Sequence, residues 1–441
     1  MTTEYKSELL KKIQQRDVHV GVIGLGYVGL PLALSFPEKG IRVTGFDIDP
    51  RKVEMLMKGE TYIMHMDANR VARALKDKLL DATSDFGRLH EPDALLIAVP
   101  TPLTPQREPE MKYVVTTAGQ IRDRLRKGQL VVLESTTYPG TTDELVRGIL
   151  EQTGLVCGKD FFLAFSPERE DPGNKQYNTK TIPKIVGGVD ESSGEIAANL
   201  YGLAIDSVVQ VSSARAAEAT KLTENIFRAV NIALVNELKV VYDRMGIDVW
   251  EVLDAAATKP FGFMKFTPGP GLGGHCIPLD PFYLTWKARE YGVSTRFVEL
   301  SGEVNVAMPR YVIDKLQLAL NERGLALKNA KILLLGLAYK KDIDDPRESP
   351  SFELIDILLR RGALVTYHDP HISLAPKMRS WPDLPAMHSV PLDAQTLATA
   401  DAVLIATEHS SVDYDLVLKH AKLVVDTRGV FRKPKPNVVK A

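Results

Sequence analysis

Three glycines in the pattern Gly24-x-Gly26-x-x-Gly29 directly follow the apolar run Val18–Ile23 and open a stretch with helical spacing. In this context each glycine has a physical task. Gly24 permits a tight turn, Gly26 lets the backbone approach a pyrophosphate, and Gly29 lets the helix pack closely on the strand. The helix N-terminus offers N–H groups and a partial positive charge to phosphates. The pattern therefore predicts a strand–turn–helix unit that binds a dinucleotide.

The residues around this turn indicate which dinucleotide is bound. An acidic side chain is expected about 20 residues further on, at the end of the second strand, and Asp47 fits. A carboxylate there accepts a hydrogen bond from the ribose 2′-hydroxyl and repels a 2′-phosphate, so NAD is predicted over NADP. Arg51 and Lys52 lie close by in the sequence and oppose this preference slightly. Tyr27 and Val28, inside the turn, are expected to contact the cofactor; the alternative is a glycine turn without a ligand.

Short apolar runs alternate with helical patterns through the first half of the chain. The runs are rich in Val, Ile and Leu with little polar alternation, which is typical of strands covered on both faces. Alternation of this kind predicts an α/β fold with a parallel, doubly wound sheet. The expected strands are Val18–Ile23, Val43–Asp47, Asp93–Val99, Leu130–Glu134, Phe161–Phe165 and Ser207–Val211, with helices that include Tyr113–Arg126 and Thr141–Glu151.

From Ala214 to Met245 the pattern becomes one uninterrupted helix, because neither Pro nor Gly occurs before Gly246. Such a helix is roughly 48 Å long, which exceeds the needs of one compact domain. We expect it to join two domains and to offer a dimer surface. Further helices are expected at Asp248–Ala257 and Ser301–Arg323.

A second alternating unit follows this helical region and predicts a smaller α/β domain. The 441 residues thus divide into domains at 1–212, 213–326 and 327–441. In the last of these, strands are expected at Ala330–Leu337, Ala363–Asp369, Asp401–Thr407 and Lys422–Asp426, helices at Ser349–Arg361 and Val412–His420, and a loose tail at Lys433–Ala441.

Composition excludes several classes of function. The formal net charge of −1 favours neither nucleic acid nor an anionic membrane as a partner. The N-terminus lacks the apolar core of a signal peptide, and no long uncharged apolar stretch is present, so a cytoplasmic location is expected. The two cysteines, Cys157 and Cys276, lack C-x-x-C spacing, which argues against a structural zinc site, and no metal is expected.

Cys276 lies in a loop, F-T-P-G-P-G-L-G-G-H-C-I-P-L-D, whose glycines and prolines exclude a helix or core strand. A loop thiol near a cofactor is a candidate nucleophile, although an inert cysteine in a structural turn fits the residues equally well. Asp280 ends the same segment. The neighbouring His275 is not expected to act as the base, because adjacent side chains usually point apart. Cys157 is expected to be half-buried filler.

Polar residues in three other segments are candidates for acid/base chemistry. Lys221 and Asn225 lie four residues apart on the long helix and share a face, where they can hold an oxyanion, although a solvated pair is the plainer reading. Glu168 follows a strand in S-P-E, at the edge of the sheet where ligands bind in open α/β folds. Thr136, in E-S-T, ends another strand and can organise a water.

The ordered set of these motifs closely resembles the UDP-glucose/UDP-N-acetylhexosamine 6-dehydrogenase family, from about Val18 to Phe431. The resemblance implies two Rossmann-like, doubly wound domains joined by a helical dimerisation domain, and hence a homodimer. It assigns catalytic roles to Cys276 as thiol, Glu168 as acid/base, Asp280 as partner carboxylate and Thr136 as water organiser. Lys221 and Asn225 match the family's helix pair.

The same resemblance assigns the C-terminal domain to the UDP-sugar. Its segment G-L-A-Y-K-K-D-I-D-D-P-R-E-S-P is similar to the family's G-x-x-[FY]-K motif, in which Lys340 contacts the substrate and Arg347 reaches the cofactor. Gly273 is also expected to line the substrate site. The family chemistry removes four electrons at C6 of the sugar through a thiohemiacetal and a thioester on Cys276, with two NAD⁺ as acceptors. A role in polysaccharide biosynthesis is implied.

One departure from the family pattern bears on the sugar. UDP-glucose members usually continue S-P-E with F-L-x-E, whereas here Arg169 follows in S-P-E-R-E-D-P-G-N. This resembles the N-acetylhexosamine branch of the family, especially the enzymes that make UDP-N-acetylglucosaminuronate. UDP-N-acetylglucosamine is therefore expected first, other UDP-N-acetylhexosamines second and UDP-glucose third. The departure leaves Glu170 without an assigned role. A two-electron hydroxyacid dehydrogenase and a non-catalytic nucleotide-binding regulator are the remote alternatives.

Overall fold

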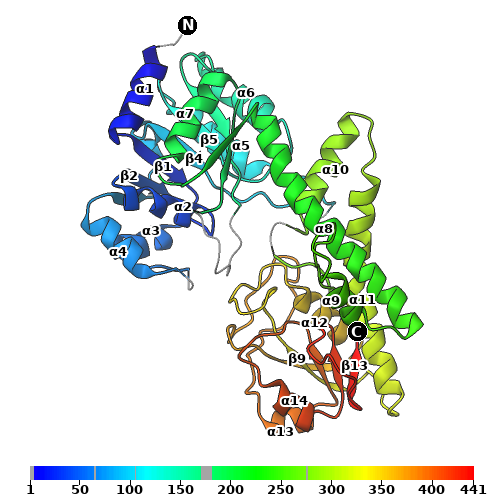
Figure 1. The fold of residues 1–441 in the computed structure, drawn as a ribbon. Coiled ribbons are helices and arrows are strands. Elements are labelled where there is room, and N and C mark those ends of the chain that lie inside the picture. The colour runs from blue at the N-terminus through cyan, green and yellow to red at the C-terminus, as the bar shows by residue number, and fades with distance from the viewer. Residues whose placement is uncertain (1–3, 64–65, 105, 170–180, 275–276) are drawn as a thin grey trace. The chain divides into compact units, whose positions relative to one another are not determined.

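The computed structural model describes residues 4–63, 66–104, 106–169, 181–274 and 277–441. They form two compact units (Figure 1). The N-terminal unit comprises Met1–Glu224 with Phe282–Val293, and the C-terminal unit comprises Asn225–Pro281 with Ser294–Ala441. Helix α8 (Ala214–Met245) has the predicted bounds; it begins in the first unit and ends in the second.

An eight-stranded sheet forms the centre of the N-terminal unit, in the order β3-β2-β1-β4-β5-β6-β7-β8. All neighbours are parallel except β6 and β7, so the prediction of a wholly parallel sheet is wrong at that one pair. Two of the strands, β3 and β7, were not predicted. The strands are β1 (His19–Ile23), β2 (Arg42–Phe46), β3 (Leu80–Thr83), β4 (Ala94–Ile97), β5 (Leu130–Leu133), β6 (Phe162–Phe165), β7 (Lys184–Gly188) and β8 (Val208–Val211).

Helices cover both faces of this sheet. Successive strand residues therefore pack into two different apolar cores. In β4, Ala94 and Leu96 belong to one core and Leu95 and Ile97 to the other. Side chains alternate across a strand, so a continuous apolar run is what two covered faces require. The helical elements are α1 (Glu4–Gln15), α2 (Gly29–Ser35), η1 (Pro37–Lys39), α3 (Pro50–Met57), α4 (Ala68–Lys76), η2 (Phe86–His90), α5 (Lys112–Arg122), η3 (Thr141–Val146), α6 (Arg147–Leu150), η4 (Glu151–Thr153) and α7 (Glu191–Tyr201).

The C-terminal unit contains a five-stranded parallel sheet in the order β10-β9-β11-β12-β13. The order changes direction at β9, as it does at β1 in the larger sheet, so both sheets have a switch point of the kind where open α/β sheets bind ligands. The elements of this unit are α9 (Val249–Ala256), α11 (Arg296–Asn321), β9 (Lys331–Leu335), α12 (Pro350–Arg360), β10 (Leu364–His368), α13 (Ala394–Thr399), β11 (Ala402–Ile405), α14 (Tyr414–His420), β12 (Val424–Asp426) and β13 (Val438–Lys440). Helix α10 (Asp280–Glu290) begins in this unit and belongs to the N-terminal unit from Phe282 onward.

The prediction of a loose C-terminal tail is wrong. Residues Val438–Lys440 form β13 and pair in parallel with β12. The backbone N–H of Ala441 donates to the carbonyl of Asp426 at 2.9 Å, and the side chain of Ala441 is 1% exposed. Two prolines and three lysines suggested disorder, but an open edge of a sheet pairs readily with any extended segment that reaches it.

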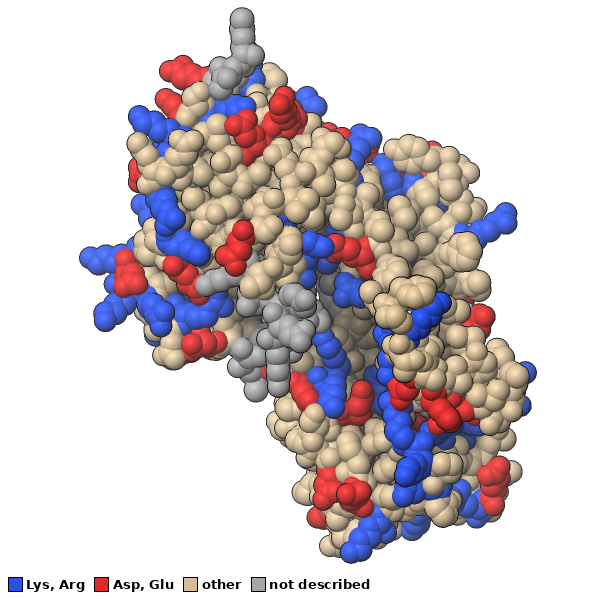
Figure 2. All heavy atoms as spheres, in the orientation of Figure 1, with Lys and Arg blue, Asp and Glu red and all other residues tan. Residues whose placement is uncertain are grey.

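The surface carries both signs of charge. Figure 2 shows Lys and Arg interspersed with Asp and Glu on the face that it views, which agrees with the formal net charge of −1. Within the described ranges no helix is long and apolar enough to cross a membrane.

Candidate active site

The glycine turn joins β1 to α2 with the geometry that its sequence predicts. Gly24 has φ +91°, and a side chain there would meet the carbonyl oxygen of Ala98 at 2.5 Å. A Cβ on Gly29 would lie 1.8 Å from the carbonyl oxygen of Gly24. By contrast, a Cβ on Gly26 would meet nothing within 4 Å, so open space lies above that residue. The backbone is thus bare where a pyrophosphate has to approach the start of α2. Val28 lies at the N-cap of α2, and Tyr27 is 38% exposed beside it.

Asp47 follows β2 and is fixed by its neighbours. Its Oδ2 atom accepts from the N–H of Leu25 at 2.9 Å, and Oδ1 accepts from the N–H of Asp49 at 2.9 Å. Of the two cations that complicated the sequence reading, Arg51 pairs with Asp49, whereas Lys52 Nζ lies 3.2 Å from Asp47 Oδ2. Oδ2 thus accepts from both Leu25 and Lys52, whereas Oδ1 keeps a further lone pair for a ribose hydroxyl. These residues fit NAD, and the turn and Asp47 would hold its pyrophosphate and ribose.

Glu168 lies just beyond the carboxyl end of β6, and its side chain is 17% exposed. Its Oε1 atom accepts from the N–H of Arg169 at 2.7 Å, and Lys184 Nζ lies 3.9 Å from its Oε2. The guanidinium of Arg169 pairs with Glu224 on α8 at 2.6 Å and donates to the carbonyl of Pro183. A carboxylate beside a buried ammonium at the edge of the sheet is a candidate for proton transfer.

Thr136 follows β5 and is partly exposed. The segment after it is held by Glu218 of α8, which accepts from the N–H of Gly140 at 2.7 Å and from both the N–H and hydroxyl of Thr142. Burial raises the pKa of Glu218 to about 7. Sequence reasoning missed Glu218, because one acid in a long amphipathic helix looks like a solvated residue.

The two polar residues predicted on α8 are both buried. Lys221 is 5% exposed and Asn225 is 0% exposed, so a solvated pair, the plainer reading, is excluded. Within the C-terminal unit, the amide of Asn225 donates to the carboxylate of Asp280 and its oxygen accepts from Arg228. Asp280 is itself buried and is the first residue of α10, where a loop residue was expected.

The loop that carries the candidate thiol is described only up to Gly274; Cys276, His275 and Glu170 lie outside the described residues. A Cβ on Gly273 would lie 2.6 Å from Cβ of Tyr339, and one on Gly274 would lie 3.0 Å from the ring of Tyr339. Only glycine fits this contact, which places the thiol loop directly against the segment that contains Lys340.

Lys340 lies on a segment that is fixed on both sides. Asp369 accepts from the backbone N–H groups of Leu337 and Ala338, and His409 Nδ1 accepts from the N–H of Asp342 at 3.0 Å. Because Nδ1 is an acceptor, the proton lies on Nε2, 3.1 Å from Asp369 Oδ2. Burial alone would raise the pKa of Asp369, but this hydrogen bond and the backbone N–H donors outweigh that effect and hold it at about 2.

Arg347 was expected to reach a cofactor. In this structure its guanidinium makes a bidentate pair with Asp345, at 2.6 to 3.0 Å. Cys157 is half-buried, as predicted, and burial raises the pKa of its thiol to about 12, so it is not a nucleophile.

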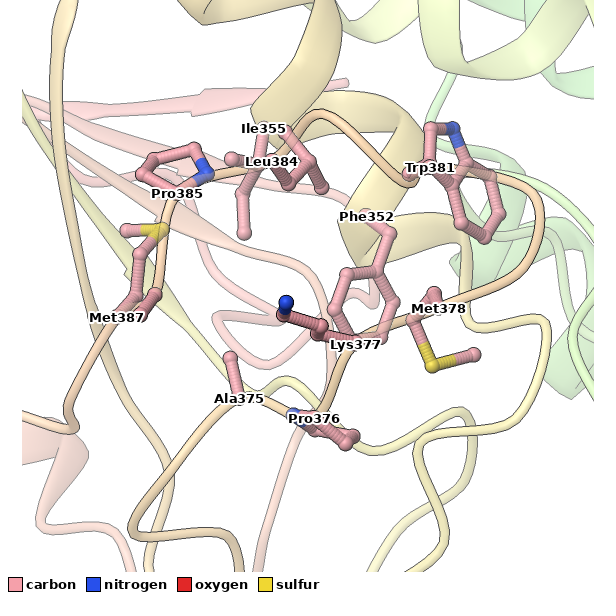
Figure 3. A pocket seen from close by; sticks show the side chains of 11 residues that line it. Phe352, Ile355, Ala375, Pro376, Lys377, Met378, Trp381, Leu384, Pro385 and Met387 are labelled. Atoms are coloured by element: carbon pink, nitrogen blue, oxygen red, sulfur yellow. The ribbon is translucent and has the colours of Figure 1, made fainter.

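A pocket of about 50 Å³ in the C-terminal unit lies apart from all predicted site residues (Figure 3). Its walls are largely apolar, and Phe352 and Trp381 stack within it at 5.7 Å between ring centroids. Lys377 is the charged residue of its lining. The pocket offers no acid/base pair, so we do not place the chemistry there.

Comparison with known proteins gives one consistent family. Three successive domains of the UDP-glucose/GDP-mannose dehydrogenase family match: the NAD binding domain over residues 18–205, the central domain over 215–307 and the UDP binding domain over 333–433. The chain is 35% identical to UDP-N-acetyl-D-glucosamine 6-dehydrogenase of Pseudomonas aeruginosa, covering 90% of this chain and 91% of that one. It is also 35% identical to UDP-N-acetyl-D-mannosamine dehydrogenase of Escherichia coli K12, covering 94% and 99%.

Solved structures agree with the sequence comparison. The UDP-D-ManNAc dehydrogenase of Pyrococcus horikoshii superposes with a TM-score of 0.86 at 31% identity, covering 96% of this chain and 98% of that one. A UDP-glucose dehydrogenase from Pyrobaculum islandicum gives 0.81 at 30% identity, covering 94% and 95%.

Proposed function

This chain belongs to the UDP-glucose/GDP-mannose dehydrogenase family and is an NAD-dependent oxidoreductase, and from that premise we propose that it oxidises UDP-N-acetylglucosamine at C6 to UDP-N-acetylglucosaminuronate. The observation that carries the choice of sugar is Arg169, which directly follows Glu168. The relatives named for UDP-N-acetylglucosamine and UDP-N-acetylmannosamine are equally identical to the chain. Overall identity therefore does not separate the two sugars, and the support for UDP-N-acetylglucosamine comes from the local sequence at Arg169.

The proposed chemistry uses side chains from each part of the chain. Lys221 and Asn225 stabilise negative charge on the C6 oxygen as its proton leaves. The turn at Gly24–Gly29 would hold NAD⁺, which would supply the hydride acceptor for each of the two oxidations. The Cys276 thiolate adds to the aldehyde carbon to give a thiohemiacetal, and loss of hydride leaves a thioester.

Water then attacks the thioester carbon, and the Cys276 thiolate leaves. Glu168 accepts a proton from that water, Thr136 orients it, and Asp280 fixes Asn225. Lys340 and Gly273 contribute to the UDP-sugar site, and Arg347 contributes to cofactor binding. The sum is one alcohol, two NAD⁺ and one water giving one carboxylate, two NADH and the released protons.

NADH formation run to completion tests the function and the sugar together. With UDP-N-acetylglucosamine we expect two NADH per sugar, and we expect UDP-glucose to be a poor substrate. UDP-N-acetylgalactosamine and UDP-N-acetylmannosamine are run in parallel. A preference for UDP-glucose would show that Arg169 does not mark an enzyme for N-acetylated sugars. One NADH per sugar would show that the reaction stops at the aldehyde and forms no thioester.

We also propose that the chain forms a homodimer through its central helices. On α8, Phe227, Leu234 and Val241 are 47%, 51% and 44% exposed and recur every seven residues, so they lie along one face of the helix. Unpartnered apolar faces of this kind mark interaction surfaces. This face lies in the part of the chain that matches the family's central domain, residues 215–307.

Replacing Leu234 and Val241 together by lysine is expected to convert the dimer to a monomer. Light scattering at micromolar concentration should change from about twice 48.8 kDa to about that mass. Leu364→Lys, at a leucine that is 55% exposed on β10, is the matched control and should leave the mass unchanged. A double variant with the wild-type mass would place the interface elsewhere.

A further inference from the structure

A buried polar cluster lies behind the segment that carries Glu168. Lys184, the first residue of β7, has a side chain that is 5% exposed, and its Nζ donates to Glu134 Oε2 at 2.6 Å. The Glu134 side chain is 0% exposed, and its other oxygen accepts from the hydroxyl of Tyr201. The Lys184 ammonium lies 5.2 Å from the centre of the Tyr201 ring. A buried lysine is costly unless it is paired in this way.

The same ammonium also contacts the Glu168 segment twice. Lys184 Nζ donates to the carbonyl of Pro167 at 3.0 Å, which is the peptide directly before Glu168. It lies 3.9 Å from Glu168 Oε2. The Lys184 side chain therefore contacts both the backbone before Glu168 and the carboxylate of Glu168.

We propose that Lys184 is a positioning residue for Glu168: it fixes the Pro167–Glu168 peptide and supplies the positive charge that favours the ionised carboxylate. The inference rests on the proposed function, because it needs Glu168 as the acid/base group. Lys184 itself does not touch the substrate.

Stability alone does not account for this arrangement. Replacing a buried ion pair by apolar residues of similar size is often neutral or stabilising. Burial raises the pKa of Glu134, with Lys184 opposing that rise, so the pair is not an electrostatic gain in itself. What an apolar replacement would remove is the ammonium beside Glu168 and the donor to Pro167.

Other charged and titratable groups near Glu168 come from several elements. Glu134 follows β5, and Tyr201 ends α7. Arg169 and Glu224 form a pair with each other at 2.6 Å, so their charges largely cancel at Glu168. Among the described residues Lys184 is the cation with a printed ion-pair contact to the Glu168 carboxylate, and it is itself paired with Glu134 at 2.6 Å.

The pH dependence of kcat/KM for UDP-sugar oxidation tests the proposal. A general base works only when ionised, so its protonation produces the acidic limb of the profile, and Glu168→Gln should remove that limb. In Lys184→Met the carboxylate loses the positive charge that lies 3.9 Å from its Oε2 atom. We expect the limb to move upward by about one pH unit. Lys184→Arg keeps the positive charge, so its acidic limb should lie close to the wild-type pH.

A second variant guards against misfolding, because Lys184→Met leaves Glu134 buried without its cation. Lys184→Met with Glu134→Gln removes both charges and keeps an acceptor for Tyr201; its limb should also move upward. NAD binding, measured by fluorescence, reports whether the N-terminal unit is folded. An acidic limb at the wild-type pH in variants that still bind NAD would overturn the proposal. Loss of NAD binding in both variants would also overturn it, since the cluster would then be needed for folding. Failure of the proposed function is distinct: the wild-type protein would oxidise no UDP-sugar.

Discussion

Replacing Cys276 by serine is expected to abolish formation of the carboxylate, by at least about 10³-fold, the order of loss seen when a covalent nucleophile is removed. A serine hydroxyl at its ordinary pKa is a far weaker nucleophile than a thiolate. It cannot hold the aldehyde or form the thioester from which the second hydride leaves. The first oxidation needs no covalent bond to the protein, so the aldehyde is expected to form slowly and to remain bound or hydrated.

Product analysis of a single turnover measures this effect directly. Wild-type protein should give the uronate, and Cys276→Ser should give at most the aldehyde with one NADH. Cys157→Ser is the matched control, because burial raises the pKa of that thiol to about 12 and leaves it unreactive. Steady-state acid production by Cys276→Ser at the wild-type rate would exclude the covalent role.

The parts of the fold that sequence predicts well are those whose residues have one consistent environment. Strands β4 and β5 are apolar and buried at every position because both faces are covered. Helix α8 has the predicted bounds because its apolar spacing continues from Ala214 to Met245 without a break. In these elements the apolar pattern of the sequence and the burial of the side chains both follow from packing against the core.

The elements that sequence missed depend on distant partners. Strand β7 begins with Lys184, which looks like a solvated strand end, yet this lysine is buried because Glu134 lies 50 residues away in sequence and 2.6 Å away in space. Strand β13 forms because the edge of β12 is open to it. No local propensity encodes either pairing, so tertiary contact decides.

The candidate site likewise contains local features, which the sequence predicts, and contacts between distant residues, which it does not. The glycine turn is local, and its spacing predicts the geometry that Gly24, Gly26 and Gly29 adopt. The contact between Asn225 and Asp280 joins residues 55 positions apart, and their approach was expected only from the family resemblance. The fixing of the Lys340 segment by Asp369 and His409 was not predicted at all, because an acid after a strand and a lone histidine have many possible uses.

Gly29→Ala is expected to eliminate NAD binding and to destabilise the N-terminal unit. The added Cβ would lie 1.8 Å from the carbonyl oxygen of Gly24, which is backbone and cannot rotate away. Helix α2 would have to move off β1, and its N-terminus would no longer face the pyrophosphate. Overpacking of this kind costs about 1–3 kcal/mol or more. We expect the melting temperature to fall by on the order of 5–10 °C and the NAD dissociation constant to rise by at least about 100-fold.

Gly26→Ala is the variant that separates the two effects. Its Cβ would meet no atom within 4 Å, so the protein without ligand should melt at the wild-type temperature. The methyl group would nevertheless occupy the space through which the pyrophosphate approaches the backbone, and NAD affinity should fall by about tenfold or more. Calorimetric titration with NAD and thermal melting of both variants give the two quantities independently. Wild-type NAD affinity in Gly26→Ala would mean that the cofactor phosphates bind away from this turn, whereas equal melting losses in both variants would mean that the space above Gly26 is filled by protein.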